Sequence, residues 1–165
     1  MKIFQRLIWL AVLGGVGWWL WTLCFPSPEK QVLKQVARLA ASANIAVGDG
    51  PITRASKAVS VSSEFATDAE IALDAPGVGP HNLSGREEIH AAALGGFSSL
   101  SALHVQFRDA TAKVGADRQS AEVDCTAEVS AGDNHEFGVQ ELRFQFKKID
   151  GDWLITRAET VKPLQ

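Results

Sequence analysis

An uninterrupted apolar stretch near the N-terminus, from Leu7 to Phe25, constrains this chain most. It reads LIWLAVLGGVGWWLWTLCF and contains no charged side chain. As a helix with a rise of about 1.5 Å per residue it would be roughly 28 Å long, close to the thickness of the hydrocarbon core of a bilayer. The stretch therefore predicts a helix that crosses a membrane once.

A short basic start followed by an apolar run is also typical of a cleaved signal peptide. Two observations favour an uncleaved anchor. The apolar run is longer than the usual core of a signal peptide, and the bulky Trp21, Leu23 and Phe25 stand where a small-x-small cleavage site would lie. Leu23, directly before Cys24, also disfavours acylation of the lipoprotein type.

Basic residues indicate the orientation of the span. Lys2 and Arg6 precede it, and the rule that basic residues stay in the cytoplasm places the tail of residues 1–6 there. The bias is slight because basic residues also follow the span, but the very short tail supports the same orientation. We expect a single-pass membrane protein whose domain, over residues 29–162, lies outside the cytoplasm, in the periplasm if the source is bacterial.

Charge disfavours one class of partner. Lys2 and Arg6 are two of the sixteen basic residues, so fourteen basic and nineteen acidic residues lie beyond the span, and the net charge there is −5. An acidic domain without a basic stripe is a poor binder of nucleic acid. Of the two cysteines, Cys24 lies at the end of the span and Cys125 in an expected strand, so no internal disulfide is expected.

Three helices are expected in the domain. Ser27-Pro28-Glu29 is a typical helix start, and apolar residues then recur at three- and four-residue steps to about Asn44. Residues 52–65 fit a helix or a strand by their pattern alone. Ser84-Gly-Arg-Glu87 fits a capping box that opens a further helix, which should end near Gly95-Gly96.

The strands follow a period of two. Residues 69–74 predict one strand, whereas residues 75–82 are rich in glycine and proline and predict a loop. Asp150-Gly151 is the strongest signal of a two-residue hairpin in the sequence. From residue 103 the pattern predicts an antiparallel meander, with strands over about 103–114, 119–129, 135–148 and 153–161.

Two motifs stand out in this order of elements. Gly-Arg-Glu-Glu-Ile (Gly85–Ile89) follows a loop that begins Asp74-Ala-Pro-Gly77, and the last hairpin reads Phe-Lys-Lys-Ile-Asp-Gly-Asp-Trp-Leu-Ile (Phe146–Ile155). With the helices and the meander, they resemble nuclear transport factor 2-like domains, most closely the SnoaL-like branch. The resemblance favours a helix over residues 52–65. It implies an α+β fold, a cone-shaped curved antiparallel sheet packed on about three helices, often around an apolar pocket.

The hairpin turn sets an expected register for the last two strands. Directly opposed residues share a face, and the expected pairs are Phe146 with Ile155, Phe144 with Arg157 and Leu142 with Glu159. The concave face is then expected to carry these pocket-lining residues: Phe107, Asp109, Cys125, Gln140, Leu142, Phe144, Trp153, Arg157 and Glu159.

Asp109, Arg157 and Glu159 are the candidate catalytic residues of this set. Arg157 would hold the Glu159 carboxylate ionised, and an ionised carboxylate orients a water or abstracts a proton. The favoured interpretation is nevertheless an ion pair that closes the end of the last strand, with Asp109 two strands away. A ketosteroid-isomerase-like oxyanion site would need a tyrosine, and the chain has none.

No metal site or cofactor is expected. The four histidines, His81, His90, His104 and His135, have no second ligand at metal-binding spacing on one helix face. The glycines of residues 75–82 are not followed by a helix in the pattern that cradles phosphate.

Two functions fit these observations. The favoured one is a non-catalytic module, held at the outer face of the membrane, that binds a protein partner or a small apolar molecule. The alternative is a SnoaL-like enzyme with acid/base chemistry of the isomerase, hydratase or cyclase type on a hydrophobic molecule. Only residues 26–28 separate the span from the first helix, so the domain should lie close to the bilayer, which favours an assembly role. Ala11 and Gly15 also have the spacing of a helix-packing pair, which leaves a homodimer open.

Overall fold

A computed structural model describes residues 27–75, 79–132 and 136–161, so the expected tail and membrane span lie outside the described residues. The helices and strands follow one another in the order α2 (Pro28–Ala43), α3 (Pro51–Ser63), β1 (Phe65–Ala75), β2 (Gly79–Ser84), α4 (Arg86–Ser99), β3 (Leu103–Val114), β4 (Ser120–Ala131), β5 (Glu136–Ile149) and β6 (Asp152–Thr160). Within these described ranges, no helix is long and apolar enough to cross a membrane.

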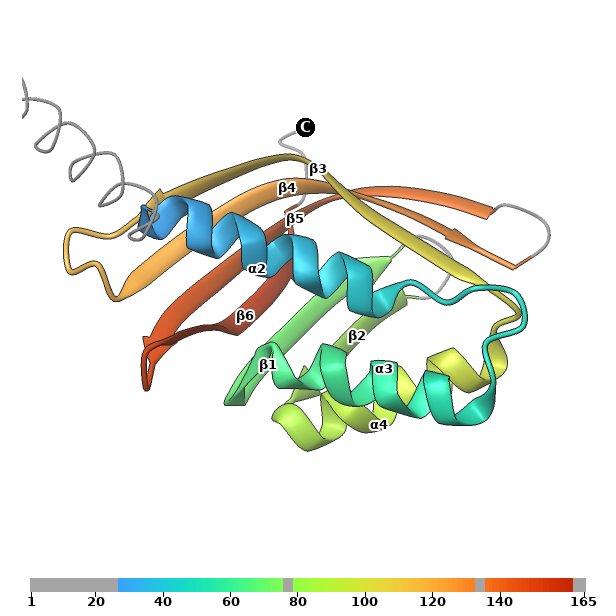
Figure 1. The fold of residues 1–165 in the computed structure, drawn as a ribbon. Helices are drawn as coiled ribbons and strands as arrows, with labels where there is room; N and C mark the ends of the chain where they lie inside the picture. The colour runs from blue at the N-terminus through green and yellow to red at the C-terminus, as the bar shows by residue number, and fades with distance from the viewer. Residues whose placement is uncertain (1–26, 76–78, 133–135, 162–165) are drawn as a thin grey trace, which may run out of the picture.

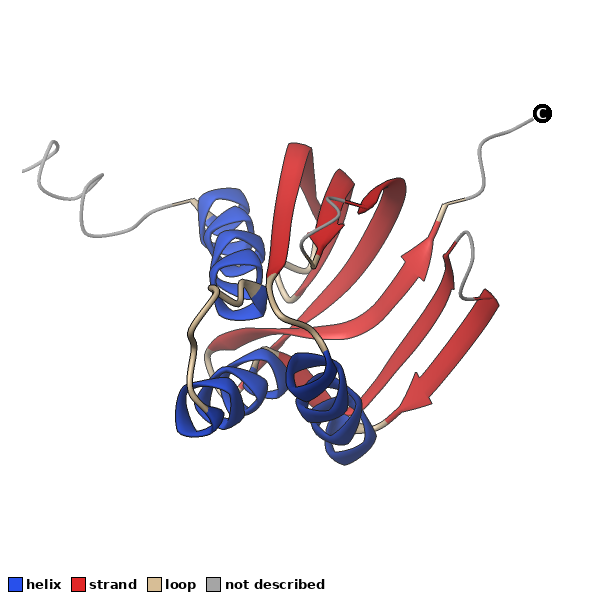
Figure 2. Cartoon of the chain, turned by 90° about the vertical axis from the view of Figure 1, so that its right-hand side faces the viewer, coloured by secondary structure: helices blue, strands red, loops and turns tan. Residues whose placement is uncertain are grey.

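The strands form one curved sheet in the order β2-β1-β6-β5-β4-β3. β1 and β6 run parallel, and the other neighbouring pairs are antiparallel. α2 lies across the concave face and contacts β3, β4 and β6, whereas α3 and α4 pack against each other and against β1 (Figure 1, Figure 2). The expected α+β fold, a curved sheet packed on three helices, is confirmed for the described residues.

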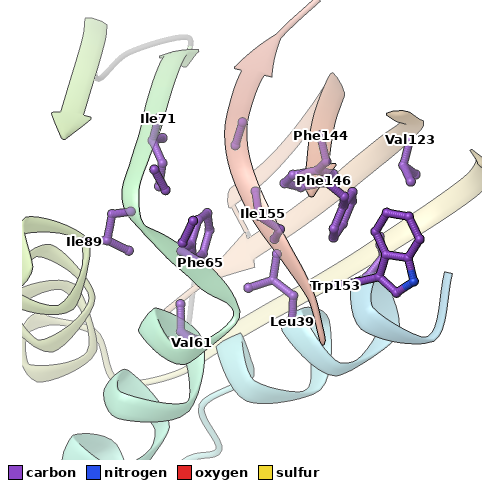
Figure 3. Close-up of a cluster of buried hydrophobic side chains, with 14 of the residues drawn as sticks. Leu39, Val61, Phe65, Ile71, Ile89, Val123, Phe144, Phe146, Trp153 and Ile155 are labelled. Carbon is purple, nitrogen blue, oxygen red and sulfur yellow. The ribbon is translucent and has the colours of Figure 1, made fainter. Parts of the chain in front are cut away.

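The hydrophobic core fills the concave side of the sheet (Figure 3). Along β4 every second side chain is buried from Ala121 to Ala127, while the charged side chains between them are half-buried on the other face. The largest fully buried side chains are Phe146, Ile155, Val32 and Val123. Removal of this apolar surface from water is the main driving force for the fold.

Side chains fix both ends of α2. At its start, the Ser27 hydroxyl accepts a hydrogen bond from the backbone N–H three residues on (3.5 Å), as the helix start predicted. At its end, Asn44 Oδ1 accepts a hydrogen bond from the N–H of Val105 in β3 (2.6 Å). The next residue, Ile45, pairs with Leu103 through two backbone hydrogen bonds. The end of α2 is therefore joined to the edge of the sheet.

The Gly-Arg-Glu motif positions α4, by contacts that differ from the predicted capping box. Gly85 has a φ of 85°, which glycine adopts without strain, and begins the turn into the helix. Arg86 donates through Nε and Nη2 to the first carbonyl of β1 (2.9 and 2.6 Å). The Ser84 N–H bonds to the carboxylate of Glu88 (2.7 Å), so the predicted pairing of Ser84 with Glu87 is wrong.

Two segments depart from their local sequence signals. Residues 79–84 form the edge strand β2, paired with residues 70–75, where a loop was predicted. α4 continues through Gly95 and Gly96 to Ser99. In both places tertiary pairing and packing outweigh a weak local preference, and the proline of β2 lies on an edge strand, where a missing N–H is tolerated.

Glu64, directly after α3, places a half-buried carboxyl group between α3 and α2. Gln35 Nε2 on α2 donates to one of its oxygens. Burial raises the pKa of Glu64 above its ordinary value, and the smaller effects of Arg38 and Gln35 act in the opposite direction. The ionised carboxylate is therefore less favourable in the folded chain than in the unfolded chain.

Glu64→Gln is expected to change how stability depends on pH. Because the folded pKa exceeds the unfolded one, the protonated form stabilises the fold below the unfolded pKa, and this contribution is lost as the pH rises through the folded pKa. The free energy of unfolding of the variant, relative to wild type, should therefore rise as the pH increases above about 4.5, the ordinary value for a glutamate. Urea unfolding at a series of pH values measures this difference, and a difference that does not vary with pH would contradict it.

Candidate binding groove

The register of β5 and β6 changes at Thr156. Up to Ile155 the pairing is as predicted, with Phe146 opposite Ile155, but Thr156 is an extra residue in β6 and forms a β-bulge. Beyond the bulge Phe144 pairs with Ala158 and Leu142 with Thr160. Since a one-residue shift moves side chains to the opposite face, the prediction that Arg157 and Glu159 share the concave face with Phe144 is wrong.

Arg157 and Glu159 belong to a row of ion pairs on the outer face of the sheet. Arg157 contacts both Glu159 (2.9 Å) and Glu70 of β1 (2.9 Å). Farther along the row, Arg143 of β5 contacts Asp124 of β4 (2.8 Å). The hydrogen bond and charge of Glu159 raise the pKa of the Arg157 guanidinium. The predicted ion pair is thus present, but it is partly exposed, and such pairs stabilise a fold only modestly.

Asp109 lies in a second bulge, in β3. There, residues 109 and 110 face a single residue of β4, and Asp109 adopts a φ of 52°, in the left-handed region, with an exposed side chain. No hydrogen bond or ion pair between described residues links Asp109 to Arg157 or Glu159. The structure therefore does not bring the three candidate catalytic residues together.

The remaining predicted pocket residues fill the concave side or bind backbone. Phe107, Leu142, Phe144, Cys125 and Trp153 belong to the core or pack against it. The rings of Phe107 and Phe144 meet edge to face, with centroids 5.4 Å apart. Burial raises the pKa of the Cys125 thiol to about 12, which disfavours a nucleophilic thiolate. Gln140 donates from its side-chain amide to the carbonyl of Asp74 and thereby joins β5 to β1.

Two adjoining hollows lie between α2 and β3. Their volumes are about 540 and 560 Å³, and both are bordered by Ala41, Asn44 and His104. Their other apolar lining consists of Leu33, Val36, Ala37 and Ala40 from α2, Ile45, Ala46 and Val47 from the connection that follows, and Ala102, Leu103, Val105, Phe107 and Ala110 in and before β3. We call the two hollows together the α2–β3 groove.

The edge of the sheet borders this groove, because β3 is the last strand and lies beside α2 (Figure 2). Leu103 and Val105 use their outward N–H groups in the contacts with the end of α2. In an antiparallel ladder the outward direction recurs at every second residue, so the N–H and C=O of Phe107 point outward as well. Among the backbone hydrogen bonds that the described residues form outside the regular helices and ladders, none reaches these two groups. Such an edge is able to pair with another strand.

Lys57 and Asp49 hold one end of the groove in place. The Lys57 ammonium contacts the carboxylate of Asp49 (2.7 Å) and donates to the carbonyl of Asn44 (2.6 Å). The hydrogen bond from Lys57, together with one from the N–H of Ala46, lowers the pKa of Asp49. These contacts tie the connection after α2 to α3 and thereby fix one end of the groove.

Little in the sequence indicated this groove. Ala37, Ala40 and Ala41 leave room beside α2 because their side chains are small, but alanine also has the highest helix propensity, so its presence in a helix needs no groove to explain it. His104 is exposed at the junction of the two hollows, and His135 lies outside the described residues. No three His, Cys, Asp or Glu side chains gather into a metal-binding group among the described residues.

Several solved structures share the fold of this chain. No protein family and no curated protein matches the sequence. An NTF2-like protein with a cystatin-like fold from Novosphingobium aromaticivorans is similar, with a TM-score of 0.62, 22% identity and 79% of each chain covered. An NTF2-like protein of unknown function from Pseudomonas putida gives a TM-score of 0.64 at 10% identity, over 86% of this chain and 90% of that one. A provisionally assigned scytalone dehydratase from N. aromaticivorans gives 0.60 at 14% identity, over 82% and 83%. The fold is therefore NTF2-like, as the sequence motifs indicated.

Proposed function

We propose that this protein is a membrane-tethered, non-catalytic module that binds an extended apolar segment of a partner protein in the α2–β3 groove. The observation that carries the proposal is the combination of an apolar groove with the outward backbone groups of Phe107 on an edge strand. Strand addition of this kind draws affinity from main-chain hydrogen bonds and specificity from alternate side chains.

The shape of the site favours a peptide over a small molecule. The groove follows β3 from Leu103 to Ala110, a length of roughly 26 Å at about 3.3 Å per residue. Small apolar ligands are usually enclosed on most of their surface, and the enclosed side of this sheet is filled by Phe144, Phe146 and Trp153. Binding of a small apolar molecule in the same groove is the second possibility, and the peptide-binding assay distinguishes it.

The tether is the apolar stretch from Leu7 to Phe25. Ser27, two residues beyond it, already caps α2, and α2 forms one wall of the groove. A bound partner would therefore be held close to the bilayer, outside the cytoplasm, with little freedom of orientation. This arrangement suits an assembly role more than a freely diffusing catalyst.

Ala37→Arg is expected to abolish peptide binding, because an arginine would fill the hollow of the groove that Ala37 and Phe107 line. The assay measures binding of labelled eight-residue peptides with alternating apolar side chains to the full chain in lipid nanodiscs, by fluorescence anisotropy. We expect the variant to lose at least about tenfold in affinity, a penalty typical of a blocked contact.

Ala91→Arg, the same change at an exposed alanine of α4, serves as the control and should bind as wild type does. Methylation of alternate backbone nitrogens of the peptide should also weaken binding, since strand addition needs those N–H groups. Equal affinity of Ala37→Arg and wild type would place the peptide elsewhere. Binding of small apolar molecules without any peptide would replace the partner role by a ligand-carrying one.

An acid/base enzyme of the SnoaL type is the alternative, and the similarity to a provisionally assigned dehydratase favours it. The groups available are Arg157 with Glu159, and Asp109. Turnover of a hydrophobic substrate that is lost in Glu159→Gln would support this alternative over the binding role.

A further inference from the structure

The basic side chains of the domain fall into two groups. Lys57, Arg108, Lys113, Arg143 and Arg157 form ion pairs, while Arg54 and Arg86 donate to backbone carbonyls. A second group forms no ion pair with any described residue, and five of its members are Lys30, Lys34, Arg118, Lys147 and Lys148. Four of these five are exposed and Lys148 is half-buried.

These five unpaired cations lie at one end of the molecule. Lys30 and Lys34 are on the first half of α2, Arg118 is in the β3–β4 turn, and Lys147 and Lys148 are near the end of β5; Figure 1 shows these elements. The turn and the end of β5 touch, because the Lys148 N–H donates to the carbonyl of the residue after Arg118 (2.8 Å). Figure 1 shows the start of α2, the β3–β4 turn and the β5–β6 turn on the same side. We call this the tether end, since Ser27 lies there.

The tether end and the rest of the domain also differ in net charge. The tether end carries these five basic residues against four acidic ones, namely Glu29, Asp117, Asp150 and Asp152. The remaining residues beyond the span hold nine basic and fifteen acidic side chains. An anionic surface would attract the tether end weakly and repel the rest of the domain, so both effects favour one orientation.

We propose that the tether end lies against the headgroup layer of the membrane, where its unpaired lysines and Arg118 contact anionic lipid phosphates. This inference rests on the membrane tether of the proposed function and adds the orientation of the domain to it. In this orientation the Leu33 end of the α2–β3 groove lies nearer the bilayer, and its Val47 end lies farther away. A partner would therefore reach the Val47 end from the aqueous side.

Amide hydrogen exchange of the full chain tests the orientation. The chain is reconstituted into vesicles of phosphatidylcholine alone and of phosphatidylcholine mixed equally with phosphatidylglycerol. We expect residues 115–119 and 147–152 to exchange about threefold more slowly or better in the anionic vesicles, and high salt to remove the difference, because it screens the charges.

The variant Lys34→Gln/Arg118→Gln/Lys147→Gln/Lys148→Gln should lose this protection, whereas the control Arg108→Gln/Arg157→Gln, which removes cations from the outer face, should keep it. Retention of the chain in neutral vesicles after an alkaline wash reports on the tether alone. A chain that is retained but shows equal exchange in both lipids overturns the orientation and leaves the tether intact. A chain that is washed out overturns the tether. If soluble polyanions instead of vesicles protect the tether end from amide exchange, these cations bind an acidic macromolecule and not lipid.

Discussion

Phe146→Ala is expected to lower the free energy of unfolding by about 3–5 kcal/mol, the usual cost of truncating a fully buried aromatic side chain. Phe146 is 1% exposed, lies in the middle of the core and has its ring centroid 6.4 Å from that of Phe144. The neighbouring strands cannot close over the space it leaves, because β4 pairs with β5 without interruption and β6 pairs with it on both sides of the bulge at Thr156. Urea unfolding of the full chain in mild detergent, followed by circular dichroism, measures the loss.

Gln145→Ala is the matched control for this substitution. Gln145 is the preceding residue of β5, and its exposed side chain points to the outer face. Its truncation should change the free energy of unfolding by less than about 0.5 kcal/mol. Equal losses in the two variants would mean that the sheet does not bury the face that carries Phe146.

The periodic signals predicted most of this fold. The alternation of residues 103–114 gave the bounds of β3, and Asp150-Gly151 gave the last hairpin, in which both turn residues have positive φ (52° and 97°). These signals depend on a residue and its near neighbours, so a single sequence carries them. β2 escaped prediction because its pairing with β1 is decided by the rest of the sheet and not by its own composition.

The positions of the candidate site residues were not predictable in the same way. Phe146 opposite Ile155 follows from the turn, but one extra residue at Thr156 sends Arg157 and Glu159 to the outer face. A similar bulge at Asp109 displaces that side chain in β3. A bulge has no strong local signature, and each one reverses every face assignment beyond it. The α2–β3 groove is harder still to predict, because it depends on how far a helix lies from a strand edge.

Arg54 joins three segments outside the sheet: α3 itself, the connection before it and the end of α4. Its Nε donates to the carbonyl of Asp49 before α3 (2.8 Å). The other guanidinium nitrogens donate to the carbonyls of Phe97, Leu100 and Ser101 around the end of α4. The positive charge also lies where the α4 dipole is negative. One side chain thus satisfies several carbonyl groups that the end of a helix leaves without partners.

Arg54→Ala is therefore expected to lower the free energy of unfolding by about 3 kcal/mol, since it removes several charge-assisted hydrogen bonds at once. Arg54→Lys should recover little of this, because an ammonium group cannot reproduce the planar fork that contacts carbonyls on two sides. Thr53→Ala, at the exposed neighbouring position of α3, controls for helix propensity and should cost far less. Hydrogen exchange should show that the loss begins at the α3–α4 pair, with the β4–β5 ladder still protected, because the guanidinium bonds to carbonyls beside these helices and to none in β4 or β5. Full rescue by lysine would show instead that Arg54 acts through its charge alone. Uniform loss of protection across the sheet would show that its contribution is not confined to the helix pair.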